Sequence, residues 1–94
     1  MNVYKFLDAT KGNYKRATRT GNAHYIAEVF KAYETFCLLY RMDIITQKTF
    51  DSYFSNFYNM ASNLYADLLK NKELYKFVKE LTTSNFFNED KKER

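Results

Sequence analysis

Few side chains in this 94-residue sequence could carry out a reaction. His24 is the single histidine, and Glu28 follows one helical turn later; such a pair on a polar helix face is typical of a surface ion pair rather than of a catalytic centre. Cys37 is the single cysteine and lies in the apolar run FCLLY, where a thiol stays protonated and unreactive. No CxxC, HExxH, P-loop or dinucleotide-binding motif occurs. We therefore expect a protein that is not an enzyme and that uses neither a cofactor nor a metal.

Positive charge is concentrated near the N-terminus. The net charge is +4, and residues 1–22 carry five basic side chains against Asp8 alone, whereas the rest of the chain carries ten basic and ten acidic groups. Cations neutralise phosphates, and one aromatic ring among them could stack on a base. The residues that we expect to bind nucleic acid or another partner are Lys11, Tyr14, Lys15, Arg16 and Arg19. The alternative is that these cations only keep the terminus solvated.

A second candidate surface lies opposite the aromatic stripe of the segment 46–70. Over three helical turns this side carries small uncharged polar residues, where an ordinary exposed helix face carries Lys and Glu. Such residues allow close approach and hydrogen bonding to another surface. The predicted protein interface, with a second copy or with another protein, consists of Ser52, Ser55, Asn56, Asn59, Ser62 and Asn63. The alternative is a set of tolerated surface residues in an Asn-rich chain.

The pattern of apolar residues predicts an all-α protein of one domain, residues 1–94. There is no proline, and both glycines precede residue 22, so nothing after that position interrupts a helix. Apolar residues at helical spacing predict helices over 23–42, 47–70 and 72–83, and the longest pattern, 46–70, is the one around which we expect the chain to be organised. Residues 1–22 are expected to form a short helix or apolar anchor over 2–9, followed by a basic arm or loop with room for one helical turn around 14–18, and residues 88–94 to be disordered.

Residues that cap helices support these boundaries. Asn22, Thr46 and Asn71 each precede a helical pattern and can accept a hydrogen bond from its first turn, and Gly21 suits a left-handed residue. The short link MDIIT makes the second and third helices an antiparallel hairpin, with the next helix folded back. The predicted fold is a small helical bundle built on this hairpin, with a ring-rich core and a basic N-terminal arm.

The run YRMDIITQKTFDSYFSNFY, preceded by an aromatic helix and followed by ELYKFVKEL, resembles a family of small helical bacterial domains without known function. The resemblance covers residues 25–81 and consists of a helix end, a link with paired aliphatic residues and an aromatic-rich helix. Thr46 and Gln47 stand where that family usually has an acidic pair, and its usual glycine before the link is missing. The resemblance implies a helical hairpin and no particular chemistry.

We expect a non-enzymatic binding module that docks helical faces and the basic arm on a larger protein or nucleoprotein. The composition is similar to that of small inhibitors and accessory factors of phages and mobile elements. Direct binding of DNA or RNA through the basic arm is the alternative, and a homodimer is compatible with the polar face. The longest apolar run has five residues, far short of a membrane span, and with no signal peptide we expect a soluble protein of the cytoplasm without a membrane partner.

Overall fold

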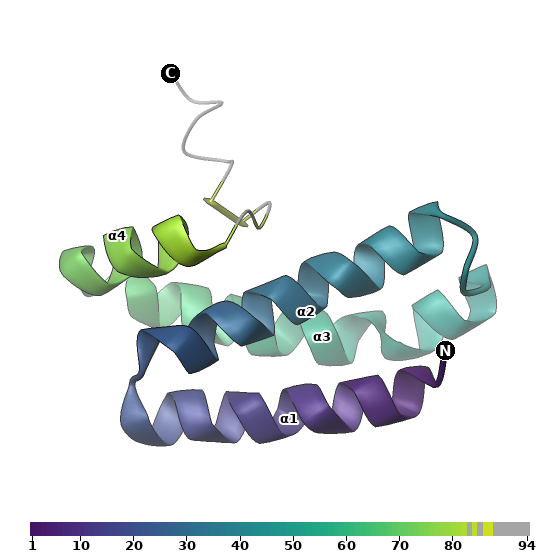
Figure 1. The fold of residues 1–94 in the computed structure, drawn as a ribbon, viewed down its shortest axis with the longest axis horizontal. Helices are drawn as coiled ribbons and strands as arrows, with labels where there is room; N and C mark the ends of the chain where they lie inside the picture. The colour runs from purple at the N-terminus through teal and green to yellow at the C-terminus, as the bar shows by residue number, and fades with distance from the viewer. Residues whose placement is uncertain (83, 85, 88–94) are drawn as a thin grey trace.

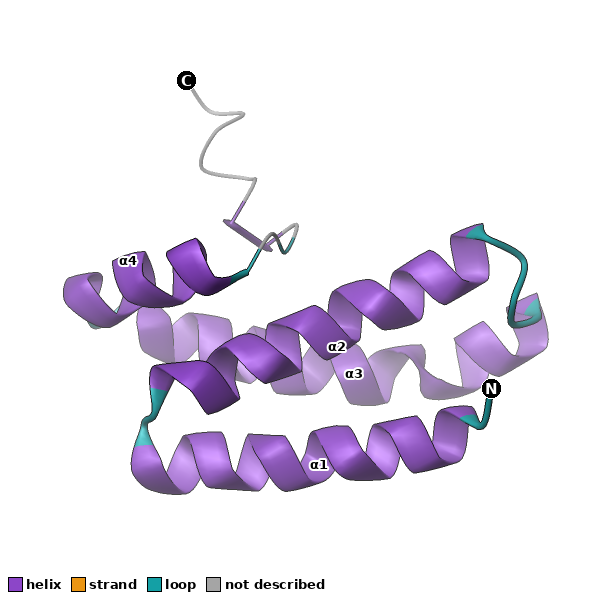
Figure 2. Cartoon of the chain, in the orientation of Figure 1, coloured by secondary structure: helices purple, strands orange, loops and turns teal. Residues whose placement is uncertain are grey.

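The computed structural model describes residues 1–82, 84, 86 and 87. They form four helices, α1 (Val3–Thr20), α2 (Ala23–Arg41), α3 (Gln47–Leu68) and α4 (Lys72–Leu81), arranged as a small bundle (Figure 1). No strand occurs in this part of the chain (Figure 2). The prediction of an all-α bundle built on an antiparallel α2–α3 hairpin is confirmed. The disorder predicted for 88–94 concerns residues outside the described part.

The structure corrects the expected division of residues 1–22 into a short helix or anchor and an arm or loop, because Val3–Thr20 form one continuous helix of 18 residues. Gly12 lies inside α1 and does not break it. The reason is tertiary packing: one stripe of α1 is buried against α2 and α3, and this burial outweighs the helix propensity lost at a single glycine. The buried stripe consists of Val3, Leu7, Thr10 and Ala17.

The helix boundaries follow the capping residues. Asn22, Thr46 and Asn71 cap α2, α3 and α4, as predicted, and the side chain of Asn2 caps α1 in the same way by accepting a hydrogen bond from the backbone N–H of Lys5. Gly21 is left-handed, with φ of 68°. Each helix therefore begins at a residue that satisfies its free N–H groups locally.

The central element is α2, which packs against α1, α3 and α4, whereas α3 and α4 have little contact with each other. The sequence pattern had instead suggested that α3 organises the chain. The core is rich in rings, as expected: Phe36 of α2 stacks on Phe57 and Phe50 of α3, with centroids 4.4 and 5.1 Å apart, and Phe6 of α1 contacts Phe57 at 5.3 Å.

Two features complete the packing. In the α2–α3 link Asp43 has a left-handed backbone, with φ of 59°, and the buried Ile45 anchors the link to the core. Near the end of the described chain, Phe86 and Phe87 lie on rings of α2, α3 and α4 and hold this segment on the core. Ser84 is fully buried and its hydroxyl accepts a hydrogen bond from the backbone N–H of Phe86.

Candidate functional site

The helical conformation of α1 arranges its cations in two rows on the exposed side. Lys11, Lys15 and Arg19 follow one another at intervals of four residues and so form one row along the helix. Arg16 lies on the opposite flank, toward α2, where its guanidinium lies 6.0 Å from the centre of the Tyr25 ring. Lys5 lies three turns before Arg16 on the same flank. It was not among the predicted binding residues, because its position beside Arg16 becomes visible only when α1 is treated as one continuous helix.

Tyr14 has a different role from the one predicted. Its ring is half-buried against the core, and its hydroxyl accepts a hydrogen bond from Nδ2 of Asn63 on α3 at 3.2 Å. A ring held in this way does not present a free face to a base. The bond joins a residue of the predicted basic segment to a residue of the predicted protein interface, so the two candidate surfaces are neighbours.

The register of α1 on α3 follows from the same hydrogen bond. The two helices run in the same direction, since each is antiparallel to α2 (Figure 1). Tyr14 and Asn63 are 49 residues apart, and with this offset Lys11 lies level with Met60 and Lys15 level with Leu64. The open hollow at the other end of the pair fits the same register, because Tyr4 and Tyr53 line it together. The two lysines therefore flank Asn63 along the bundle.

The uncharged side of α3 divides into two stripes. Ser52, Asn56, Asn59 and Asn63 follow at intervals of four, three and four residues and form the stripe next to α1, whereas Ser55 and Ser62 lie farther from α1. Five of these six residues are exposed, and Ser62 is half-buried. We use the name composite face for the surface made by the α1 row and the stripe next to it: Lys11, Lys15, Arg19, Ser52, Asn56, Asn59 and Asn63.

The composite face is polar and positively charged. Acidic residues are absent from 9–20 of α1 and from 52–66 of α3; Asp8 and Asp67 stand at its borders. Most of the large apolar side chains that are exposed lie elsewhere, at the α2–α3 link, at the α3–α4 turn, on the far sides of α2, α3 and α4, and at the N-terminal end, but Tyr4 lies in line with the α1 row, two turns before Lys11. The exposed large apolar residues are Met1, Tyr4, Leu38, Met42, Ile44, Tyr58, Leu69 and Phe77.

The titratable groups considered for catalysis are held in structural contacts. Burial raises the pKa of Cys37, although a hydrogen bond from Tyr33 acts in the other direction, and the thiol is half-buried rather than fully buried. Burial, followed by the neighbouring Cys37, raises the pKa of Tyr33 to about 12. His24 packs edge-on against the Phe77 ring with centroids 5.9 Å apart. Among the described residues no group of three or more His, Cys, Asp or Glu side chains could hold a metal ion.

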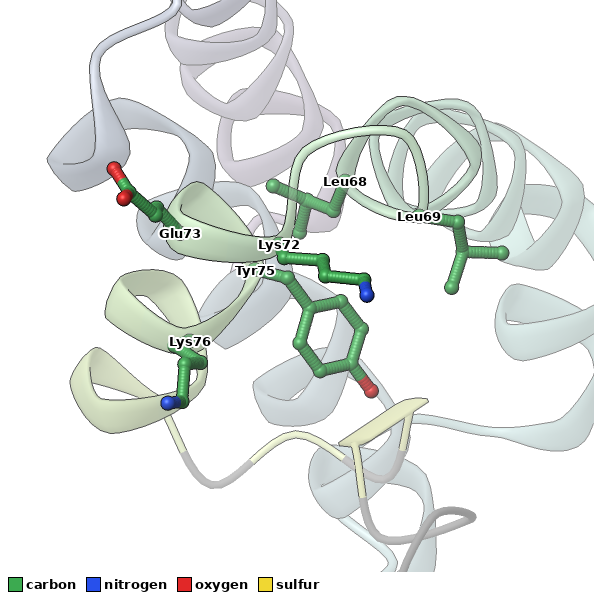
Figure 3. Close-up of a pocket in the computed structure, with 6 residues that line it drawn as sticks. All are labelled: Leu68, Leu69, Lys72, Glu73, Tyr75 and Lys76. Atoms are coloured by element: carbon green, nitrogen blue, oxygen red, sulfur yellow. The ribbon is translucent and has the colours of Figure 1, made fainter.

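One hollow of about 490 Å³ lies at the α3–α4 turn and is lined by residues that include Leu68, Leu69, Lys72 and Tyr75. In Figure 3 the side chains of Leu69, Lys72 and Tyr75 come close together, while Glu73 and Lys76 extend on the other side of α4. The hollow is shallow and open, and its charged lining residues, Lys72, Glu73 and Lys76, are exposed and flexible side chains of α4. It therefore lacks the several fixed polar groups that orient a small ligand.

No family model matches the chain, and no curated protein and no solved structure matches it either. The resemblance of residues 25–81 to a family of small helical domains accordingly stays a prediction. None of the helices within the described residues is sufficiently long and apolar to span a lipid bilayer.

Proposed function

We propose that this protein is a non-enzymatic binding module that docks its composite face on a larger nucleoprotein assembly. The observation that carries the proposal is the hydrogen bond between Asn63 and Tyr14, because it joins the basic row of α1 and the uncharged stripe of α3 into one surface. The basic row and the uncharged stripe thus form one continuous surface, with cations on one side and hydrogen-bonding amides on the other.

The composite face is suited to docking because it is rigid. Its residues lie on two regular helices that are buried against a common core of stacked rings, so little backbone conformational entropy is lost when a partner binds. We further propose that the protein acts inside the cell. The similarity of its composition to small phage and mobile-element proteins makes host machinery the expected larger partner, with an inhibitory or accessory role.

The proposal is tested by capture of partners from the native host with two matched variants. Asn59→Trp places a large ring in the centre of the composite face, and Thr35→Trp places the same ring on the exposed side of α2. We expect Asn59→Trp to lose the partners that the wild type retains and Thr35→Trp to keep them, with both variants folded by circular dichroism. Equal retention by the two variants would show that the composite face is not the docking surface. Light scattering of the purified wild type tests the alternative that the face pairs two copies.

A further inference from the structure

We propose that the composite face binds the phosphate backbone of double-stranded DNA, with Lys11, Lys15 and Arg19 as the phosphate-binding row. This inference rests on the proposed function, because it names the chemistry of the partner for the same face. Four observations carry it: the spacing of the cations, their lack of acidic partners, the fixed position of Tyr14, and the absence of exposed large apolar residues between Lys11 and Arg19.

The row of cations has the dimensions of a contact with one DNA strand. Residues four apart on a helix are separated by about 6 Å along its axis, so the row extends over about 12 Å. A DNA strand carries one phosphate for about every 3.4 Å of axis, so the row spans several phosphates. In the described chain these three side chains have no carboxylate partner, and their charge is therefore available to replace the counterions of DNA.

The position of Tyr14 favours a duplex over a single strand. Proteins that bind single strands stack bases on exposed aromatic rings. Tyr14 is the only ring within the basic segment 11–22, and it is half-buried with its hydroxyl bonded to Asn63. The exposed ring of Tyr4 lies two turns before Lys11, outside the row of cations. A duplex does not require an exposed ring, and the major groove of B-DNA, about 12 Å wide, admits a helix such as α1. The major groove of an RNA duplex is deep and narrow, so side chains cannot enter it in the same way.

The chemistry of the face favours DNA over a protein partner. Interfaces between proteins have a core of aromatic and aliphatic side chains, and a few such anchors supply most of the affinity. The basic row has none between Lys11 and Arg19; the nearest exposed ring, Tyr4, borders the face two turns before Lys11. Interfaces with DNA are more polar and more positively charged, and Asn and Ser side chains commonly contact phosphate oxygens beside Lys and Arg. Asn56, Asn59 and Asn63 stand in that position beside the row.

The test uses the purified full-length chain and a fluorescently labelled DNA duplex of arbitrary sequence, with binding measured by anisotropy at several salt concentrations. For three neutralised phosphates the logarithm of affinity falls with the logarithm of salt with a slope of about −2.7, so affinity decreases about 40-fold between about 50 and 200 mM salt. We expect Lys15→Ala to reduce the slope by about 0.9, Lys15→Arg to preserve it, and the triple variant of Lys11, Lys15 and Arg19 to alanine to abolish binding.

A matched control separates the composite face from net charge. The triple variant of Lys31, Lys72 and Lys76 to alanine removes the same charge from exposed positions of α2 and α4. Binding is expected to be largely retained in this control; an equal loss would overturn the inference, as would tighter binding to single-stranded DNA or to an RNA duplex. Two results together would overturn this inference and keep the proposed function: no binding of DNA at about 50 mM salt, and loss by Asn59→Trp of a protein partner that the wild type retains after nuclease treatment. If no DNA binds and Asn59→Trp retains every partner, both fall.

Discussion

Replacing Phe87 by alanine is expected to release the end of the described chain from the bundle and to destabilise the fold. The Phe87 side chain is 2% exposed. Its ring contacts one aromatic residue from each of three helices: Phe30 of α2 at 5.1 Å, Tyr65 of α3 at 5.8 Å and Tyr75 of α4 at 5.2 Å between centroids. Because α3 and α4 have little direct contact, this ring fills the space between them.

The size of the effect follows from the burial. Replacing a fully buried Phe by Ala costs about 3–5 kcal/mol. We expect the lower end, about 3 kcal/mol, because the segment lies at the edge of the fold and can move away instead of leaving a sealed cavity. A chain of this length has a total stability on the order of 5–14 kcal/mol. A loss of about 3 kcal/mol lowers the melting temperature by roughly 12–24 °C.

The assay is urea and thermal unfolding followed by far-ultraviolet circular dichroism. The matched control is Phe77→Ala on α4, whose ring is 48% exposed and, among the aromatic rings of the described residues, contacts only that of His24. We expect the control to lose less than about 1 kcal/mol, because little apolar surface leaves the core. A Phe87→Ala variant no less stable than Phe77→Ala would refute the reasoning, since the ring contacts would then contribute nothing to the folded state.

Three further predictions concern single side chains. Tyr14→Phe removes the hydroxyl that accepts from Asn63 and should destabilise the fold by about 0.5–1.5 kcal/mol, at the lower end because the bond is exposed; a double-mutant cycle with Asn63→Ala checks this, and fully additive effects would contradict the bond. The pKa of Tyr33 is raised from 10.0 to about 12, so its contribution to stability is intact below pH 10 and is lost as the pH rises through about 12; the difference in tyrosinate absorbance between wild type and Tyr33→Phe should show a step near pH 12, and a step near its ordinary value would be inconsistent with burial. Asp43→Gly should stabilise the protein by up to about 1 kcal/mol in urea unfolding, because Asp43 is left-handed, while Asp43→Val should destabilise it by about 1–2 kcal/mol; a valine variant as stable as the wild type would argue against that conformation.

The sequence was sufficient to predict the hairpin, because its signals are local. Asn22, Thr46 and Asn71 mark the helix starts, and the apolar spacing between them has no competing interruption. The continuous helix α1 was not predicted, because here the local signals point away from the observed structure. Local propensity at Gly12 argues against a helix, and the burial of Val3 and Leu7 against α2 and α3, which reverses that preference, is a tertiary effect that composition does not reveal.

The candidate site could be predicted residue by residue but not as a surface. Each row of the composite face was present in the sequence as a set of residue types. Their adjacency depends on the register of α1 on α3, and a contact between residues 49 positions apart leaves no trace in spacing or charge. In this register Tyr14 is bonded to Asn63 and has a structural role, instead of the base-stacking role predicted for it. The helical conformation of α1, not this register, separates Arg16 from the three cations with which it had been grouped.

The sequential order of contacts in the bundle has a consequence for the speed of folding. The antiparallel pairs α1–α2 and α2–α3 are joined by short links, so most of the native contacts form between neighbours in the chain, and helical domains of this kind fold in microseconds to milliseconds. Phe86 and Phe87 must return to rings of α2 that lie more than fifty residues earlier, a longer loop to close. Their docking is therefore expected to be the final step of folding. Until then the rings that Phe87 covers, Phe30, Tyr65 and Tyr75, remain in contact with solvent.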